Sequence, residues 1–219
     1  MDWLLLQLAD SAFPTGGFAH SGGLEAASQQ GALRGENGLR DFAVSTLWQS
    51  GHASFPLLNT AHREPGRLAE LDSLCDAFLS NPVTNRASRI QGRALISACE
   101  RCFPLPELST LSASVRDRKL CRHFAPLSGV TFRTLGVSLE QSQELCLYTA
   151  LRGVVSAAVR LGIAGPHQAQ QIQFSCYAEL NRVLDTCGAL GLESLAQTAP
   201  LLDLYQSTHD RLYSRLFQS

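Results

Sequence analysis

Apolar side chains recur three or four positions apart along most of the chain, the spacing that places them on one face of an α-helix. Two of the clearest faces are Leu68, Leu71, Cys75 and Phe78, and Leu145, Tyr148, Leu151, Val155 and Val159. No segment shows a convincing alternation of apolar and polar residues, the pattern of a half-buried strand. Leucine and alanine supply 61 residues against 13 for valine plus isoleucine, a bias toward helix formers. The sequence therefore predicts an all-α fold.

Start and stop signals divide the chain into about eight to ten helices, a multi-helix bundle. Asn81 before Pro82 is typical of an N-cap and a first helical position, and Ser138 with Gln141 fits a capping box. The expected helices cover about 3–11, 22–30, 38 to beyond 48, 68–79, 82–102, 114–124, 139–161, 166–188 and 194–216. The segment 126–136 has no strong period and fits either a helical turn or a buried loop.

The length of 219 residues predicts a single domain over 1–219, because such a chain can bury most of its apolar surface without disulfides or metal. No internal repeat, low-complexity tract or long linker divides the sequence. The last segment, 205–219, is amphipathic throughout. It fits a segment that docks on a partner, or a helix that folds onto its own core.

Composition and charge narrow the classes of partner. Charged residues make up 17% of the chain and apolar residues 45%. Because soluble domains usually carry about 25% charged residues, we expect a surface that a partner or a second copy covers, although a slightly apolar monomer fits equally well. The formal net charge of −1 shows no excess of positive charge that would favour binding to nucleic acid or to an anionic membrane.

Nothing near the start of the sequence predicts a membrane span, since the apolar run at residues 3–6 is far too short. Seven scattered cysteines, an odd number, fit reduced thiols better than a disulfide framework. We therefore expect a cytoplasmic protein.

The segment 7–25 contains four glycines, a proline and the pair His20-Ser21 between two apolar runs. Such a composition is expected where the backbone adopts unusual angles or approaches another segment closely. It lacks the lysine and hydroxyl of a P-loop, which disfavours nucleotide binding. A nucleophilic Ser21 lacks the required strand and G-x-S-x-G turn. A tight connection between helices is favoured over a cryptic hydrolase, and a recognition surface is a third interpretation.

Candidate metal ligands show no familiar spacing. Cys99 and Cys102 form a lone C-x-x-C at the C-terminal end of an expected helix, where the helix dipole does not lower a thiol pKa. No second pair completes a zinc site, so buried thiols are favoured. A direct nickel carrier using His20, His123 and the cysteines stays an alternative hypothesis, although the six histidines form no H-x-H or H-x-x-x-H pattern.

Arg86, Arg89 and Arg93 share one face of the helix expected over 82–102. They fit a solvated arginine stripe or a face that binds carboxylates of a partner or of the protein's own loops. Gly92 lies inside this helix, where glycine costs about 1 kcal/mol relative to alanine. We therefore expect another segment to approach the helix closely at Gly92.

The leading segment resembles the urease accessory protein UreF family. It matches the family pattern L-x-Q-L-x-D-S-x-x-P-x-G-G-[FY]-x-H-S-x-G-L-E from Leu5 to Glu25. The resemblance continues in order through nearly the whole chain, at residues 88–93, 123–129, 135–136, 160–170 and 213–219. It implies an all-α homodimer without catalytic activity. It also implies a bridge between UreD (also called UreH) and the GTPase UreG that delivers nickel to apo-urease and modulates GTP hydrolysis.

The resemblance also assigns roles to individual positions. It implies a UreG-facing set formed by Gly16, Gly17, Phe18, His20, Glu25 and Arg160. It implies a UreD-facing set formed by Tyr213, Arg215, Leu216 and Phe217. It assigns fold integrity, the dimer or a partner surface to Arg89, Gln91, Gly92 and Arg93. No cofactor is implied for this chain, because nickel and GTP belong to the partner complex.

Overall fold

The computed structural model describes residues 2–33 and 37–219, and within these ranges it contains helices and no strand, which confirms the all-α prediction. The α-helices are α1 (Trp3–Ala9), α2 (Leu24–Gln29), α3 (Gly38–Ala53), α4 (Phe55–Arg63), α5 (Leu68–Phe78), α6 (Pro82–Cys102), α7 (Pro106–Asp117), α8 (Phe124–Thr134), α9 (Leu139–Arg160), α10 (Pro166–Ser175), α11 (Tyr177–Cys187) and α12 (Pro200–Thr208). Short 3-10 helices cover Gly17–Ala19, Pro65–Arg67, Leu192–Ser194 and His209–Arg211.

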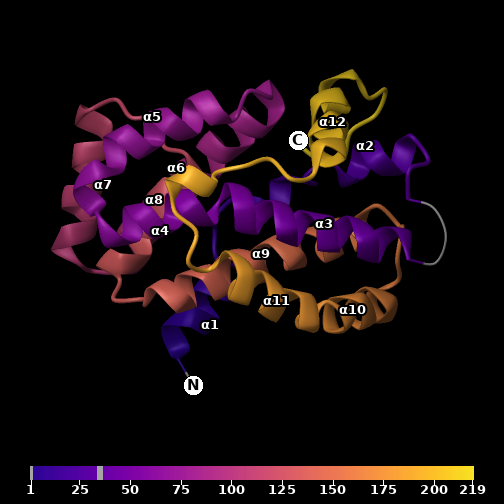
Figure 1. Cartoon of the computed structure of the whole chain (residues 1–219), viewed down its shortest axis with the longest axis horizontal. Helices are drawn as coiled ribbons and strands as arrows, with labels where there is room; N and C mark the ends of the chain where they lie inside the picture. Colours follow the sequence, from indigo (N-terminus) through magenta and orange to yellow (C-terminus); the bar gives the residue numbers. More distant parts are fainter. Residues whose placement is uncertain (1, 34–36) are drawn as a thin grey trace.

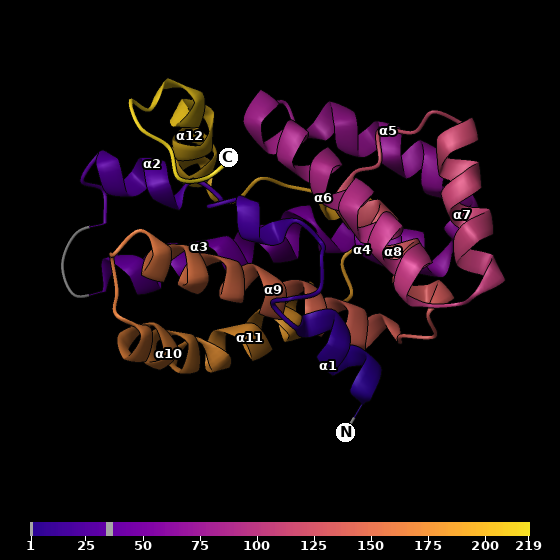
Figure 2. The same ribbon diagram turned by 180° about the vertical axis from the view of Figure 1, so that it is seen from behind.

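The helices form two groups that meet along the middle of the molecule (Figure 1). The long helices α3 and α9 pack against each other, and α10 and α11 pack along them. Helices α4 to α8 gather at the other end, where α8 packs against α4, α5 and α6. The view from behind shows α1 crossing α9, with α12 beside α2 and close to the end of the chain (Figure 2).

Helices α4 and α8 lie at the centre of the second group. Every residue from Phe55 to His62 and from Ala125 to Phe132 is buried. A side chain at Gly129 would overlap the carbonyl oxygen of Leu58, so glycine lets the two backbones approach closely. The segment whose structure the sequence left open is thus a helix, and it lacks an amphipathic period because all its faces are covered.

The capping signals predict their helices correctly. The Asn81 side chain accepts a hydrogen bond from the backbone N–H of Val83 at the start of α6, which ends at Cys102 as expected. Ser138 and Gln141 form the reciprocal bonds of a capping box at the start of α9. Side-chain caps satisfy amide groups that the first turn of a helix leaves unpaired.

Several predicted boundaries are wrong. The helix expected over 114–124 instead runs from Pro106 to Asp117, because a proline at the first helical position begins a helix as well as following one. The helix expected over 166–188 divides at Cys176, and the one expected over 194–216 shortens to α12. The stretch from Leu212 onward is not helical, because its backbone amides bond to other segments.

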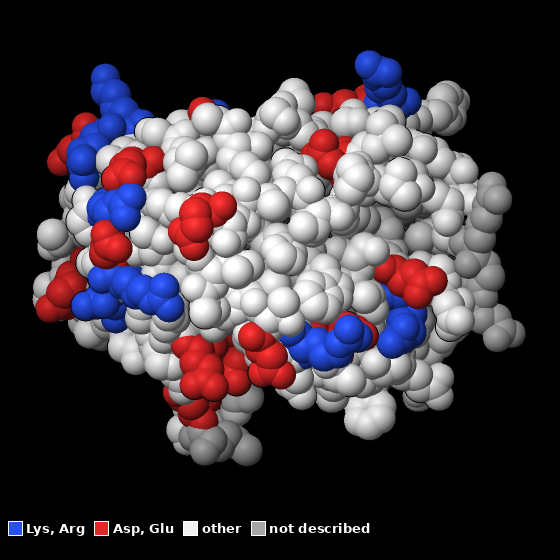
Figure 3. Space-filling model, in the orientation of Figure 1, with Lys and Arg blue, Asp and Glu red and all other residues white. Residues whose placement is uncertain are grey.

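The surface is sparsely charged on the face shown in Figure 3, where charged side chains gather along the edge over α5 and α7 and along the lower rim. The middle of that face is largely uncharged, in keeping with the low content of charged residues. Within the described ranges, no helix has both the length and the apolar character needed to cross a bilayer.

The close approach predicted at Gly92 is present. Gly92 is buried in α6, and a side chain there would overlap the carbonyl oxygen of Arg122. That carbonyl belongs to the loop 118–123, in which Lys119 and Arg122 adopt positive φ angles of 53° and 71°. The missing side chain therefore lets this irregular loop lie directly on α6.

We expect Gly92→Ala to lower the free energy of unfolding by about 1–3 kcal/mol, because the new methyl group must displace the loop backbone. Gly153→Ala is the matched control, since a side chain at Gly153 in α9 meets nothing within 4 Å. The control should instead stabilise the protein by about 0.5–1 kcal/mol. Urea unfolding of both variants measures the difference, and equal effects would contradict the close contact.

Candidate functional site

The glycine-rich segment turns sharply between α1 and α2. Gly16, Gly22 and Gly23 have φ angles of 75°, 62° and 91°, a region that residues with side chains rarely adopt. Gly23 also lies against α12, because a Cβ there would come within 3.2 Å of the backbone nitrogen of Gln206. The glycines are thus required both by the turn and by the helix that covers it. We call residues 16–23 the glycine loop.

The last residues of the sequence, 212–219, lie along the glycine loop, and we call them the tail. The N–H of Ser21 donates to the carbonyl of Ser219 at 2.6 Å, and the N–H of Gln218 donates to the carbonyl of Ala19 at 2.8 Å. These two backbone bonds join segments almost 200 positions apart in the sequence. The glycine loop and the tail therefore form one structural unit.

A buried carboxylate holds the tail. Glu25 in α2 is only 2% exposed, and its two oxygens accept the backbone N–H groups of Leu216 at 2.7 Å and Phe217 at 3.2 Å. The His209 ring is fully buried beside it, with its Nδ1 4.0 Å from the nearer Glu25 oxygen. The other ring nitrogen of His209 lies 3.2 Å from the carbonyl oxygen of Phe217. Because a buried charge is costly unless it is hydrogen-bonded, Glu25 and the tail depend on each other.

His20 and Ser21 are also used to hold the tail. The His20 Nδ1 lies 2.5 Å from the Ser219 hydroxyl, and the Ser21 hydroxyl donates to the Ser219 carbonyl at 3.1 Å. Ser21 therefore has a main-chain partner, and no hydrogen bond among the described residues joins it to His20 in a nucleophile–base pair. Burial lowers the pKa of His20 to about 4, and the nearby charge of Arg86 and the ring of His209 contribute in the same direction.

Arg160, at the end of α9, joins the glycine loop to the tail. Its guanidinium lies 3.8 Å from the ring centre of Phe18 and 4.2 Å from that of Phe217. Its Nη1 also donates to the carbonyl oxygen of Phe18 at 2.5 Å. The Phe217 ring is buried and the Phe18 ring is 64% exposed. Arginine stacked on aromatic rings is stabilised by cation–π attraction, and here it presents Phe18 to solvent.

Comparison with known proteins places the chain in a family. The UreF family model matches residues 33–177. The chain belongs to the UreF family. A protein named urease accessory protein F from Arabidopsis thaliana is 37% identical over 100% of this chain and 93% of its own length. A protein of the same name from Oryza sativa subsp. japonica is 36% identical over 98% of this chain and 84% of its own length. Urease accessory protein UreF from Arthrobacter sp. is 30% identical over 98% of this chain and 96% of its own length.

The structure brings together the two sets of positions that the UreF resemblance assigns to different partners. His20, Glu25 and Arg160 from the first set contact the tail, which carries the second set, and Phe18 lies against Arg160. Tyr213, Arg215 and Leu216 are exposed, whereas Phe217 points inward. The two sets thus form neighbouring parts of one surface.

Three residues outside the assigned site sets complete this unit: Ser219, His209 and Asp210. Asp210 pairs with Arg86 at 2.9 Å and with Arg215 at 3.3 Å. The resemblance includes Ser219, but the sequence offers no local signal for its contact with His20. Arg86, one of the three arginines on the α6 face, therefore binds a carboxylate of the protein's own C-terminal segment.

The four α6 residues to which the UreF resemblance assigns a role differ in their exposure to solvent. Gly92 is buried under the loop 118–123, whereas Arg89 and Arg93 are exposed. Gln91 lines a cavity of about 650 Å³ between the glycine loop and α9. The cavity wall also includes Arg152, which donates a hydrogen bond to the carbonyl of Ala9.

The cysteines are all free in the described structure. Cys99 is buried and Cys102 is exposed, and burial raises the pKa of the Cys99 thiol to about 12. Burial likewise raises the pKa of Cys146 to about 12. Thiols with raised pKa values are poor nucleophiles, so Cys99 has the character of a buried packing residue. The expectation that both thiols are buried is wrong for Cys102, which is exposed.

We expect the protein to lose stability as the pH falls from 6.5 to 4, because unfolded His20 binds a proton in this range and folded His20 does not. In this range the free energy of unfolding falls by about 1 kcal/mol for each pH unit. His20→Gln should show a smaller loss over the same range and no difference in slope above pH 6.5. Urea unfolding at several pH values measures both slopes, and parallel curves would contradict the effect.

We expect Glu25→Gln to loosen the tail, because the neutral amide is a weaker acceptor for the N–H groups of Leu216 and Phe217. The predicted cost is about 1–3 kcal/mol of local stability. Hydrogen exchange of a peptide covering the tail should accelerate at least tenfold in this variant. Glu140→Gln, at an exposed position of α9, is the control and should leave that peptide unchanged.

Proposed function

We propose that this chain is a non-catalytic scaffold in urease maturation. It bridges UreD/UreH and the GTPase UreG, delivers nickel to apo-urease with them, and modulates GTP hydrolysis by UreG. The observation that carries the proposal is the similarity to urease accessory proteins over nearly the full length of the chain. The geometry of the glycine loop and the tail supports a role in binding proteins rather than substrates.

The proposed UreG-facing surface is centred on Phe18. An exposed aromatic ring held by a stacked arginine is a rigid anchor of the kind that contributes most to protein interfaces. Gly16 and Gly17 shape the turn that carries the ring. Arg160 positions the ring by direct contact, and His20 and Glu25 support this arrangement by holding the tail.

The proposed UreD-facing surface is the exposed part of the tail. Tyr213 is fully exposed and Leu216 is 53% exposed, whereas the buried Phe217 anchors the tail on Arg160. We therefore propose that Tyr213, Arg215 and Leu216 contact UreD directly and that Phe217 acts by holding them in place. Since both surfaces share the tail, binding of one partner is expected to affect the other.

We further propose that the chain has no cofactor of its own and works as a cytoplasmic homodimer. GTP and nickel then belong to the partner complex. Large exposed apolar side chains support a covered surface in the working state, and they include Trp3, Leu6, Leu201 and Leu204. Arg89, Gln91 and Arg93 support the dimer or a partner surface.

The alternative of a hydrolase at His20 and Ser21 has little support. The Ser21 hydroxyl donates to a backbone carbonyl, and a nucleophile requires a base within hydrogen-bond reach. A nickel carrier that includes His20 is also weakly supported. The group of candidate metal ligands in the described structure contains His123 and Cys121 but not His20.

Phe18→Ala tests the UreG-facing surface. The backbone carbonyl that binds Arg160 is retained, so we expect a folded protein whose affinity for UreG, measured by isothermal titration with UreD present, falls about tenfold or more. Phe174→Ala removes a ring of similar exposure, 72%, from α10 and is the matched control. Equal losses in both variants, or none in Phe18→Ala, would contradict the assignment. Failure of the unaltered chain to co-elute with UreD and UreG would contradict the proposed function itself.

Tyr213→Ala tests the UreD-facing surface. We expect at least tenfold weaker binding of UreD. The melting temperature should stay unchanged, because the Tyr213 ring is fully exposed and does not pack in the core. Tyr177→Ala, at a tyrosine of α11 that is 45% exposed, is the control. Unchanged UreD binding by Tyr213→Ala would place the UreD contact elsewhere.

A further inference from the structure

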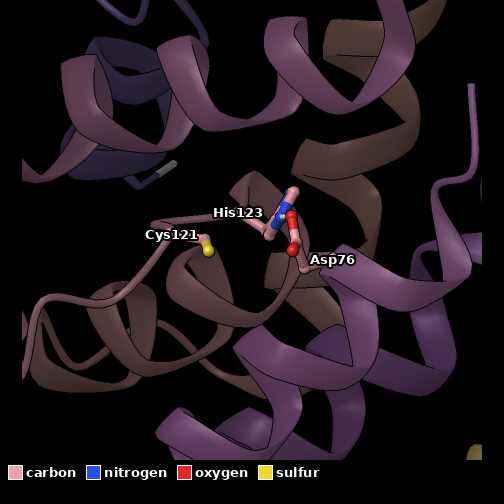
Figure 4. A group of neighbouring side chains, drawn as sticks. All are labelled: Asp76, Cys121 and His123. Atoms are coloured by element: carbon pink, nitrogen blue, oxygen red, sulfur yellow. Dashed lines mark hydrogen bonds and ion pairs between the residues drawn. The ribbon is translucent and has the colours of Figure 1, made fainter. Parts of the chain in front are cut away.

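A group of candidate ligands lies away from the glycine loop, between α5, α6 and the loop that leads into α8. It consists of Asp76 at the end of α5 with Cys121 and His123 of that loop (Figure 4). One ligand atom from each of these side chains lies within 4.8 Å of the others. The three side chains supply an oxygen, a sulfur and a nitrogen donor.

The backbone that carries two of these ligands is fixed by a buried carboxylate. Asp72 is 2% exposed and accepts the N–H groups of Cys121 at 2.5 Å, Arg122 at 3.2 Å and His123 at 2.7 Å. On the other side, Gly92 leaves room for the carbonyl of Arg122. The loop is therefore held from α5 and α6 at once, and Cys121 and His123 are positioned before any ligand binds.

The orientation of His123 suits metal binding. Its Nε2 faces Asp76, with 3.0 Å between Nε2 and the nearer carboxylate oxygen, and its Nδ1 lies 3.2 Å from the Ser88 hydroxyl oxygen. The same hydroxyl oxygen accepts the N–H of Phe124 at 3.1 Å. Without an ion, Nε2 donates its proton to the Asp76 carboxylate. An ion that enters between them replaces this proton, and Nδ1 then carries the ring proton and donates it to the Ser88 hydroxyl. A second hydrogen bond of this kind typically orients a histidine that binds a metal.

We propose that Asp76, Cys121 and His123 bind one divalent ion of the borderline class that includes Zn²⁺ and Ni²⁺. Nitrogen, thiolate and carboxylate donors together favour such ions over Mg²⁺ or Ca²⁺. A thiolate and a carboxylate balance the two charges of the ion, which leaves a neutral site. Three protein ligands leave a fourth position for water or for a further ligand.

The site is reachable from solvent on one side. The His123 side chain is fully buried, whereas the Asp76 side chain is 41% exposed and Cys121 is half-buried. The positive charge of Arg89 on α6 acts on both Asp76 and Cys121. Because the side chain of Arg89 is exposed, it can turn toward solvent when a cation enters. The chain alone supplies all three ligands. The site is therefore an exception to the expectation that metal belongs to the partner complex, and the inference is independent of the partners in the proposed function.

Isothermal titration of the reduced, metal-free full chain with Zn²⁺, Ni²⁺ and Mg²⁺ tests the proposal. We expect one Zn²⁺ or Ni²⁺ per chain and no comparable binding of Mg²⁺. Cys121→Ser and Asp76→Asn should each weaken binding at least tenfold. Cys102→Ser is the matched control, since Cys102 is exposed and outside the group, and it should bind like the unaltered chain. The relative affinities for Zn²⁺ and Ni²⁺ identify the preferred ion.

Two further measurements keep the test decisive. Asp72 binds the backbone of Cys121 rather than its side chain, so Cys121→Ser is expected to fold, which circular dichroism checks. A Co²⁺ adduct should show thiolate-to-metal charge-transfer absorption that Cys121→Ser lacks. Absence of stoichiometric Zn²⁺ and Ni²⁺ binding, or equal binding by Cys121→Ser, would overturn the proposal. Neither result would bear on binding of UreD or UreG.

Discussion

Buried backbone N–H groups outside helices need acceptors, and two buried carboxylates meet this need at the irregular segments of the protein. Glu25 accepts two N–H groups of the tail, and Asp72 accepts three from the loop that precedes α8. Leaving such groups unpaired would cost about 1–3 kcal/mol each. Each carboxylate lies on a helix, so the regular part of the fold determines the position of the irregular part. The glycine loop with its tail and the loop carrying Cys121 and His123 depend on these contacts.

The two carboxylates have different consequences for function. Around Glu25, the ordered backbone carries exposed side chains such as Phe18 and Tyr213, which suits a surface that binds other proteins. Around Asp72, the ordered backbone brings the metal-binding atoms of Cys121 and His123 close to Asp76, which suits a small ion. Arg160 adds a second connection at the first site by stacking between Phe18 and Phe217. Both arrangements give rigidity to segments that would otherwise lose much entropy on binding.

The sequence predicts local features well and long-range ones poorly. The caps at Asn81 and Ser138 and the close approach at Gly92 follow from residue chemistry within a few positions. Helix α8 has no amphipathic signal because all its faces are buried. The bonds that join the tail to Glu25 and to the glycine loop connect residues 191 to 199 positions apart, and Asp76 is 47 positions from His123. No local pattern encodes such contacts. The family resemblance assigned a binding role to the tail but did not predict that the tail lies along the glycine loop.

The pairing of the glycine loop with the tail also determines when the surface around Phe18 forms during synthesis. Residues 16–25 leave the ribosome early, but their partners at residues 209–219 are made almost 200 positions later. Until then, the Glu25 carboxylate lacks its two backbone donors and Arg160 lacks one of its two aromatic rings. A nascent or prematurely terminated chain therefore carries an unfinished version of this surface. The surface around Phe18 therefore becomes available to other proteins only after residues 209–219 have been made and have paired with the glycine loop.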